Sequence, residues 1–183
     1  EKNRKGSGEK DPWVIEDLNN HIEYLEERIK VTEKEIENLI KQSSELKPQY
    51  DLLISIPGIG PFLASTLLGE IGDFLAFENA PQLAAYIGLT PRNYRSGSSV
   101  LKKSQITKEG RVELRRCLYM PAVSALHCNP VIKSLAERMK KTNHHKMEII
   151  VAAMRKLVHL AYGVLKTQKP FDPNYGDQFN FAS

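Results

Sequence analysis

The chain has 183 residues, 41% of them hydrophobic, and a formal net charge of +4. This length can bury one core and carry one extended segment, which excludes two large domains. Its two cysteines, Cys117 and Cys128, are too few for a structural zinc site, and we expect free thiols in a reducing cytoplasm. No apolar run approaches the roughly 20 residues that cross a bilayer, so we expect a cytoplasmic protein without a membrane partner.

The first part of the chain indicates a flexible segment followed by a coiled coil. Residues 1–12 are rich in Gly, Ser, Lys and Glu, which cannot bury apolar surface. Residues 13–48 have a heptad seam, which predicts a helix of about 50 Å that pairs with a second copy and ends at Pro48. A long helix that packs on its own domain is the alternative. The seam consists of Ile15, Leu18, Ile22, Leu25, Ile29, Thr32, Ile36, Leu39, Ser43 and Leu46.

Residues 49–173 predict a compact helical domain, and residues 174–183 a tail. Two short helices over about 52–71 flank a glycine turn, and further helices are expected over 80–87, about 108–126 with a bend at Pro121, and about 146–166. Residues 88–107 are rich in Gly, Ser, Pro and Lys and predict mostly loop, and from Pro170 onward the chain is expected on the surface. No alternation typical of a long strand occurs, so the predicted fold class is all-α.

The glycine turn within 52–71 has a physical use. Gly58 and Gly60 permit a tight turn and close approach to a ligand, and the second helix, which begins at Pro61, directs unpaired N–H groups outward. A phosphate is a suitable acceptor there. The run resembles the helix-hairpin-helix motif of DNA-binding proteins, which implies that both glycines contact the DNA backbone. An ordinary turn between two helices is the alternative.

The segment from Arg92 to Arg116 is strongly basic and predicts a surface that binds nucleic-acid backbone. Its only acidic residues are Glu109 and Glu113. A solvated charged loop is the competing interpretation. The residues proposed to bind nucleic acid are Arg95, Lys102, Lys103, Lys108, Arg111, Arg115 and Arg116.

A serine within this segment has two of the three features that a nucleophile toward a phosphodiester requires, and a base to remove its proton is not identified. Ser96 is followed by Gly97, which permits close approach, and preceded by Arg95, whose charge would stabilise the transition state. From these residues alone, serines that merely solvate a loop remain the competing interpretation.

Four motifs in order strengthen the case for chemistry. They are IPGIG, AAYIGLTPRNYRSGSS, ITKEGRVELRRCLYMPA, and a helix with AAMRKLVHLAYGVL that ends in KPFDP. Over about residues 50–173 they resemble the C-terminal domain of the insertion-sequence transposases related to pilin-gene invertases, including the bridge-RNA-guided recombinases. The resemblance implies a serine nucleophile at Ser96, with Ser98 and Ser99 as further candidates, and a covalent phosphoserine link to DNA.

The same resemblance implies a RuvC-like domain ahead of the coiled coil, in which four acidic residues hold Mg²⁺. The sequence contains no such domain, and Glu70, Asp73 and Glu78 are scattered carboxylates that we expect on the surface or at helix caps. We therefore expect no metal and no other cofactor in this chain, and no strand exchange by it alone.

The resulting prediction is the DNA-binding, serine-bearing domain of a transposase or site-specific recombinase. DNA, a guide RNA and a second copy of the chain are the partners considered. A non-enzymatic DNA- or RNA-binding module, such as a transposase remnant or a regulator, is the first alternative. A structural assembly protein built on the coiled coil is the second.

Overall fold

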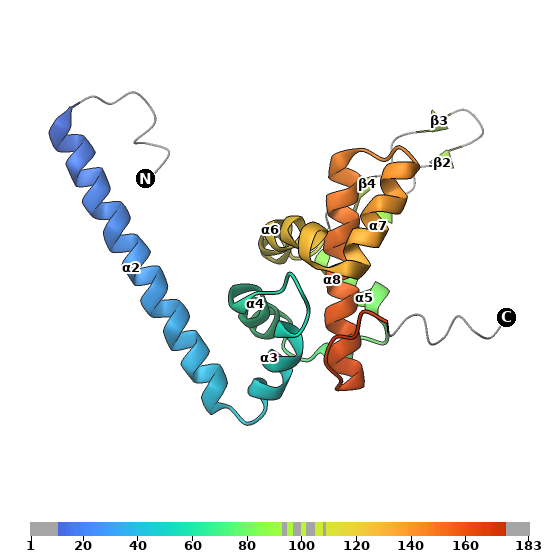
Figure 1. Ribbon diagram of the computed structural model, residues 1–183, viewed down its shortest axis with the longest axis horizontal. Helices are drawn as coiled ribbons and strands as arrows, with labels where there is room; N and C mark the ends of the chain where they lie inside the picture. The colour runs from blue at the N-terminus through green and yellow to red at the C-terminus, as the bar shows by residue number, and fades with distance from the viewer. Residues whose placement is uncertain (1–10, 93–94, 97–99, 102–104, 108, 175–183) are drawn as a thin grey trace. The chain divides into compact units, whose positions relative to one another are not determined.

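Helices account for most of the chain in the computed structural model, which describes residues 11–92, 95–96, 100–101, 105–107 and 109–174 (Figure 1). Residues 1–43 and 44–183 form two separate units. The described residues confirm the predicted all-α class, apart from four strands of two residues each. None of the described helices is long and apolar enough to cross a membrane.

The first unit contains helix α2 (Pro12–Gln42), which begins at the side chain of Asp11, the acceptor for the N–H of Trp13 at 2.9 Å. The prediction that Pro48 ends this helix was wrong. The helix ends at Gln42, where the N–H of Ser43 closes the last turn. Serine side chains compete for backbone hydrogen bonds and so favour helix ends. Pro48 instead lies in the first turn of the next helix, where a missing N–H costs little.

The second unit begins with α3 (Leu46–Ile54) and α4 (Pro61–Ile71), which pack together across the predicted glycine turn. The 3-10 helix η1 (Phe74–Ala76) and α5 (Ala80–Ile87) follow, and α5 has the bounds that the sequence predicts. Pro81 in the first turn of α5 and the Asn79 side chain, which accepts from the N–H of Gln82, explain why the start of this helix is readable from sequence.

Helix α8 (Lys146–Thr167) is the centre of the second unit and packs against α3, α5, α6 and α7 (Figure 1). Its buried stripe includes Ile150, Ala153, Leu157 and Ala161, spaced three or four residues apart as one helix face requires. The stripe predicted from sequence is thus the core face of the helix.

Helix α6 (Val112–Cys128) continues through Pro121, and α7 (Pro130–Lys141) follows after a single residue, Asn129. Helix α7 was missed by the sequence analysis. Asn129 is completely buried and caps α7, because its side-chain oxygen accepts from the N–H groups of Val131 and Ile132. Its Nδ2 donates to the carbonyl of Pro57 at 2.9 Å, which ties the α6–α7 corner to the glycine turn.

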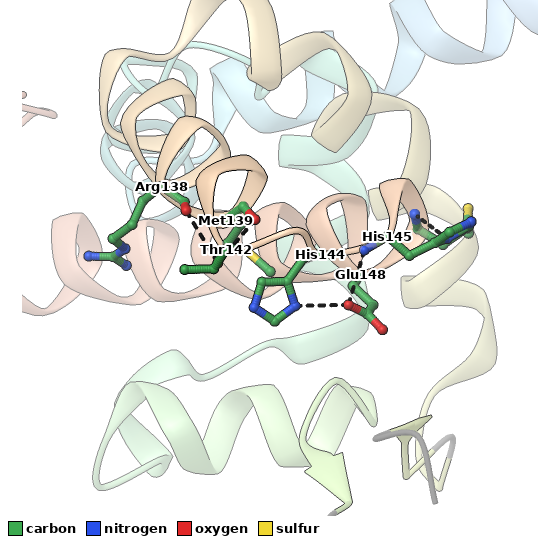
Figure 2. Close-up of polar contacts among 7 residues, drawn as sticks. Arg138, Met139, Thr142, His144, His145 and Glu148 are labelled. Atoms are coloured by element: carbon green, nitrogen blue, oxygen red, sulfur yellow. Dashed lines mark hydrogen bonds and ion pairs between the residues drawn. The ribbon is translucent and has the colours of Figure 1, made fainter.

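The α7–α8 turn is closed by side chains that satisfy helix ends (Figure 2). The Thr142 hydroxyl donates to the Arg138 and Met139 carbonyls. Glu148 contacts the His144 ring at 2.8 Å and accepts from the N–H of His145, which completes a capping box. The hydrogen bond from His144 and that from the backbone of His145 hold the pKa of Glu148 below its usual value.

The segment after α8 returns to the glycine-turn region. The N–H of Phe171 donates to the Ser55 hydroxyl at 2.8 Å, and Phe171 is half-buried. The expectation of a surface tail from Pro170 onward was therefore wrong for this residue. Phe171 can bury its ring and still satisfy its backbone, because Ser55 offers an acceptor at the end of α3. Nearly all of the predicted tail, from residue 175 on, lies outside the described residues.

Asn129→Ala should lower the free energy of unfolding by about 2 to 4 kcal/mol, because it removes the α7 cap and leaves the Pro57 carbonyl without its donor. Urea denaturation of the chain measures the change. Asn79→Ala is the matched control, since it removes a cap alone and should cost about 1 kcal/mol. Equal losses in the two variants would contradict a role for the Pro57 contact.

Candidate nucleic-acid interface and serine site

Ser96 lies in a β-hairpin arm, defined here as residues 89–109. Strand β1 (Pro91–Arg92) pairs antiparallel with β4 (Gln105–Ile106), and β2 (Arg95–Ser96) pairs with β3 (Val100–Leu101). Ser96 is opposite Val100, next to the three residues that join β2 to β3. In Figure 1 the β2–β3 pair lies farther from the helices than β4 does.

The arm replaces most of the loop predicted over 88–107. Strands of two residues are too short to produce a readable alternation of polar and apolar side chains, which explains why the sequence analysis missed them. Ser96 and Arg95 are described only in their backbone. The other predicted arm residues lie outside the described residues: Lys102, Lys103, Lys108, Ser98 and Ser99.

Two glycines stand at the root of the arm. Gly88 has φ +83° and follows α5, and Gly110 has φ +115° and precedes α6. A Cβ on Gly88 would overlap the Glu109 carbonyl, and one on Gly110 would overlap the Tyr86 carbonyl. The chain therefore enters and leaves the arm through a backbone contact that no side chain can occupy.

Two of the predicted nucleic-acid contacts make internal bonds at this root. Arg111 donates from Nε to the Tyr86 hydroxyl at 2.8 Å and lies 3.5 Å from the Glu70 carboxylate. The bond to Tyr86 raises the pKa of Arg111, which stays cationic. Arg115 is half-buried, and its Nη1 donates to the Ile87 carbonyl at 2.8 Å.

Arg116 differs from these two arginines. Its side chain is 73% exposed, and its Nη1 lies 3.1 Å from the Oε1 of Glu113, one turn away on the same helix. An exposed ion pair of this kind has a small interaction free energy, so Arg116 can exchange Glu113 for another anion. Among the described side chains of the basic segment, Arg116 is thus the one best placed to meet a phosphate.

Gly58 and Gly60, the two predicted phosphate contacts in the turn between α3 and α4, have different surroundings. Gly58, at φ +102°, faces α6: a Cβ there would lie 2.6 Å from the Ala125 Cβ. Gly60 has open space around its Cα and precedes the first residue of α4 without a side-chain cap. The backbone approach at Gly58 serves packing, whereas a Cβ on Gly60 would stand in open space.

Two of the three scattered carboxylates, those of Glu70 and Asp73, have structural partners. Glu70 pairs with Arg111, and Asp73 accepts from the N–H of Leu75 at the start of η1. Across the part of the chain that the structure describes, no three His, Cys, Asp or Glu side chains gather closely enough to bind a metal.

Sequence reasoning missed the partners that organise the site, namely Tyr86, Asn129 and Ala125. Tyr86 is 25 residues from Arg111, and Asn129 is 72 residues from Pro57, so no local pattern links them. The residues Asn129 and Pro130 did offer a signal, because an asparagine before a proline is typical of a helix start.

Known proteins resemble this chain over most of its length. Residues 50–137 match the Transposase IS116/IS110/IS902 family. The pilin gene-inverting proteins of Moraxella bovis and Moraxella lacunata are each 38% identical to this chain over 161 residues. The chain belongs to the insertion-sequence transposases. A transposase for insertion sequence element IS1328 from Yersinia enterocolitica is 32% identical over 154 residues.

The matched regions differ in extent between this transposase chain and its relatives. The Moraxella alignments cover 87% of this chain and 50% of each relative, and the Yersinia alignment covers 82% of this chain and 44% of that relative. The chain thus spans about half the length of these relatives. The family match over 50–137 includes the glycine turn, the arm and α6, so both candidate surfaces of the transposase lie within it.

Gly58→Ala should lower the free energy of unfolding by about 2 to 4 kcal/mol, because a Cβ there is strained by the positive φ and overlaps Ala125. Gly60→Ala should change it by less than about 1 kcal/mol, because the position is open and its backbone suits alanine. Thermal and urea denaturation of both variants measure the difference. Equal destabilisation by the two substitutions would refute the separate roles given to these glycines.

Proposed function

We propose that this chain is the DNA-binding part of a transposase that supplies Ser96 as the nucleophile for strand cleavage and exchange. Family membership supports the reaction class. The observation that carries the proposal is the position of Ser96 next to the end of a hairpin arm, beyond the helical core. A nucleophile for a DNA strand has to lie where that strand can reach it.

The proposed step is a transesterification at phosphorus. A bond forms between the Ser96 Oγ and the phosphorus, and the bond from that phosphorus to one ester oxygen of the strand breaks. The serine proton passes to a base, and the departing oxygen takes up a proton to leave as a hydroxyl. Since one phosphoester replaces another, the reverse attack by a DNA hydroxyl can rejoin the strand.

The cations of the arm would hold the DNA backbone and offset negative charge on the reacting phosphate. Arg95 is the proposed partner of that phosphate, and Lys102, Lys103, Lys108 and Arg116 are the proposed backbone contacts. Arg111 and Arg115 are proposed to support the arm at its root, through the Tyr86 hydroxyl and the Ile87 carbonyl. The N–H groups at the start of α4, which has no side-chain cap, are the proposed second contact with the backbone.

The Mg²⁺ that the family resemblance implies would act as an electrostatic clamp on the phosphate, held by the RuvC-like domain of such transposases. Among the described residues, Asp73 caps a helix, Glu70 pairs with Arg111, and no three acidic, His or Cys side chains gather closely enough to hold a metal. We propose that this chain contributes the nucleophile and DNA contacts, and that the metal is held elsewhere in the assembly.

Ser96→Ala tests the nucleophile. In the complete reading frame that encodes this chain, the variant should lose cleavage of a plasmid carrying the element's ends by at least about a thousandfold. The covalent protein–DNA species should vanish on denaturing gels, while DNA affinity at fixed salt stays within about twofold. Ser98→Ala and Ser99→Ala are the matched controls and should keep both activities.

The outcomes separate the competing classes. Unchanged cleavage in Ser96→Ala would refute the proposed nucleophile. Salt-dependent DNA or RNA binding without cleavage in either protein would favour the non-enzymatic module. Absence of nucleic-acid binding would favour the structural assembly protein.

We further propose that the chain self-associates through the α2 seam, where Leu25, Ile29 and Ile36 are exposed on one heptad face. Ile29→Glu should weaken dimerisation by at least about tenfold, as measured by sedimentation equilibrium. Val31→Glu is the matched control: Val31 is exposed to 51% and Ile29 to 56%, but Val31 lies off the seam. Equal effects of both substitutions, or a monomeric wild type, would contradict the proposal.

A further inference from the structure

The last four carbonyls of α5 have four different donors, two from Gly88 and Leu89 and two from Arg111 and Arg115. Gly88 N–H donates to the Ala85 carbonyl and Leu89 N–H to the Ala84 carbonyl, which is the usual closure of a helix by a glycine in the left-handed conformation. The two later carbonyls receive donors from beyond the arm: the N–H of Arg111 reaches Tyr86, and the Arg115 guanidinium reaches Ile87.

The end of α5 is therefore bonded directly to the start of α6, with the arm between them. Gly88 and Gly110 make this possible, because each has a positive φ and a Cβ on either would overlap the opposite backbone. We call this junction the clasp, formed by Tyr86, Gly88, Gly110, Arg111 and Arg115.

The clasp continues into the arm through paired backbone. The N–H of Thr107 donates to the Thr90 carbonyl at 3.0 Å, and the next pairs are Pro91 with Ile106 and Arg92 with Gln105. Ladders of two residues are too short to specify their own register. A slip by one residue would turn every side chain of a strand to the opposite face.

We propose that the clasp sets the register and direction of the arm, so that Gly88, Gly110 and Arg115 are positioning residues for Ser96. This inference rests on the proposed function of Ser96. It assigns Arg111 and Arg115 a structural task in the clasp in place of contact with DNA. Among the described residues, the backbone contact at the root is the feature suited to fix the pairing, because it admits no side chain. Arg115 stabilises this backbone contact, because its guanidinium donates a hydrogen bond to the carbonyl of Ile87, the last residue of α5.

Three glycine variants test the clasp in the complete reading frame that encodes this chain. Gly88→Ala and Gly110→Ala should each lower the rate of Ser96–DNA bond formation by about a hundredfold, the size of effect expected from misplacing a reacting group by about 1 Å. DNA affinity should change less than about threefold. Gly72→Ala is the matched control, since Gly72 also has a positive φ, +66°, but has open space around it.

Hydrogen exchange provides a readout that does not depend on chemistry. In the two clasp variants the N–H groups of Thr107 and Arg111 should exchange at least about tenfold faster, while the amides of α8 keep their protection. Unchanged exchange at both amides, or unchanged cleavage with faster exchange, would overturn the positioning role. If Ser96→Ala still cleaves, the proposed function fails, whereas the exchange data still decide whether the clasp holds the arm.

Arg115 variants cover the case in which an alanine clasp variant does not fold. Arg115→Lys retains one N–H donor for the Ile87 carbonyl and should keep cleavage within about tenfold of wild type. Arg115→Met removes the donor and should lose about as much activity as Gly88→Ala. Loss of DNA affinity beyond about threefold in Arg115→Met but not in Arg115→Lys, with unchanged exchange at Thr107 and Arg111, would show that Arg115 acts on DNA through its charge and would refute its role in the clasp.

Discussion

Close backbone contacts at both ends of α6 are the constraint on which the rest of the second unit depends. Before its first turn, Gly110 lies against the Tyr86 carbonyl, and near its last turn Ala125 lies against Gly58. Asn129, directly after the helix, donates to the Pro57 carbonyl. Since neither contact has room for a further side chain, glycine is required at Gly58 and Gly110, which lets α6 approach its neighbours closely.

The same constraint organises the candidate interface. The serine arm is held at the amino end of α6 and the α3–α4 turn near its carboxyl end, so one rigid element supports both surfaces proposed to meet DNA. The charged residues divide accordingly. Arg111 and Arg115 stabilise the junction, and Arg116, one residue further on, faces solvent. Neighbouring arginines on one helix thus have different uses because successive residues point about 100° apart.

Local signals in the sequence were sufficient for much of the fold. Pro61 after Gly60 marks the start of α4, and the apolar stripe of α8 identifies its buried face. The end of α2 was misplaced because proline was weighted above the Ser43–Ser44 pair, although a proline within the first turn is compatible with a new helix.

The candidate site was less accessible to sequence reasoning. The count of basic residues correctly marks an unusual segment, but it cannot say which guanidinium groups turn inward. That depends on acceptors distant in the chain, such as the carbonyl of Ile87, 28 residues before Arg115. The glycines Gly88 and Gly110 carried a readable hint of positive φ, yet their mutual proximity follows only from the packing of α5 beside α6.

Helix α6 acts as a spacer between the two surfaces. Its 17 residues correspond to a length of roughly 25 Å. One residue added inside it would lengthen the spacing by about 1.5 Å and rotate one surface relative to the other by about 100°. Residues added at the outer end of the arm would leave this geometry intact. Insertions are therefore expected to be tolerated at the outer end of the arm. Within α6 they are expected to be disruptive, because this helix sets the distance between the two surfaces.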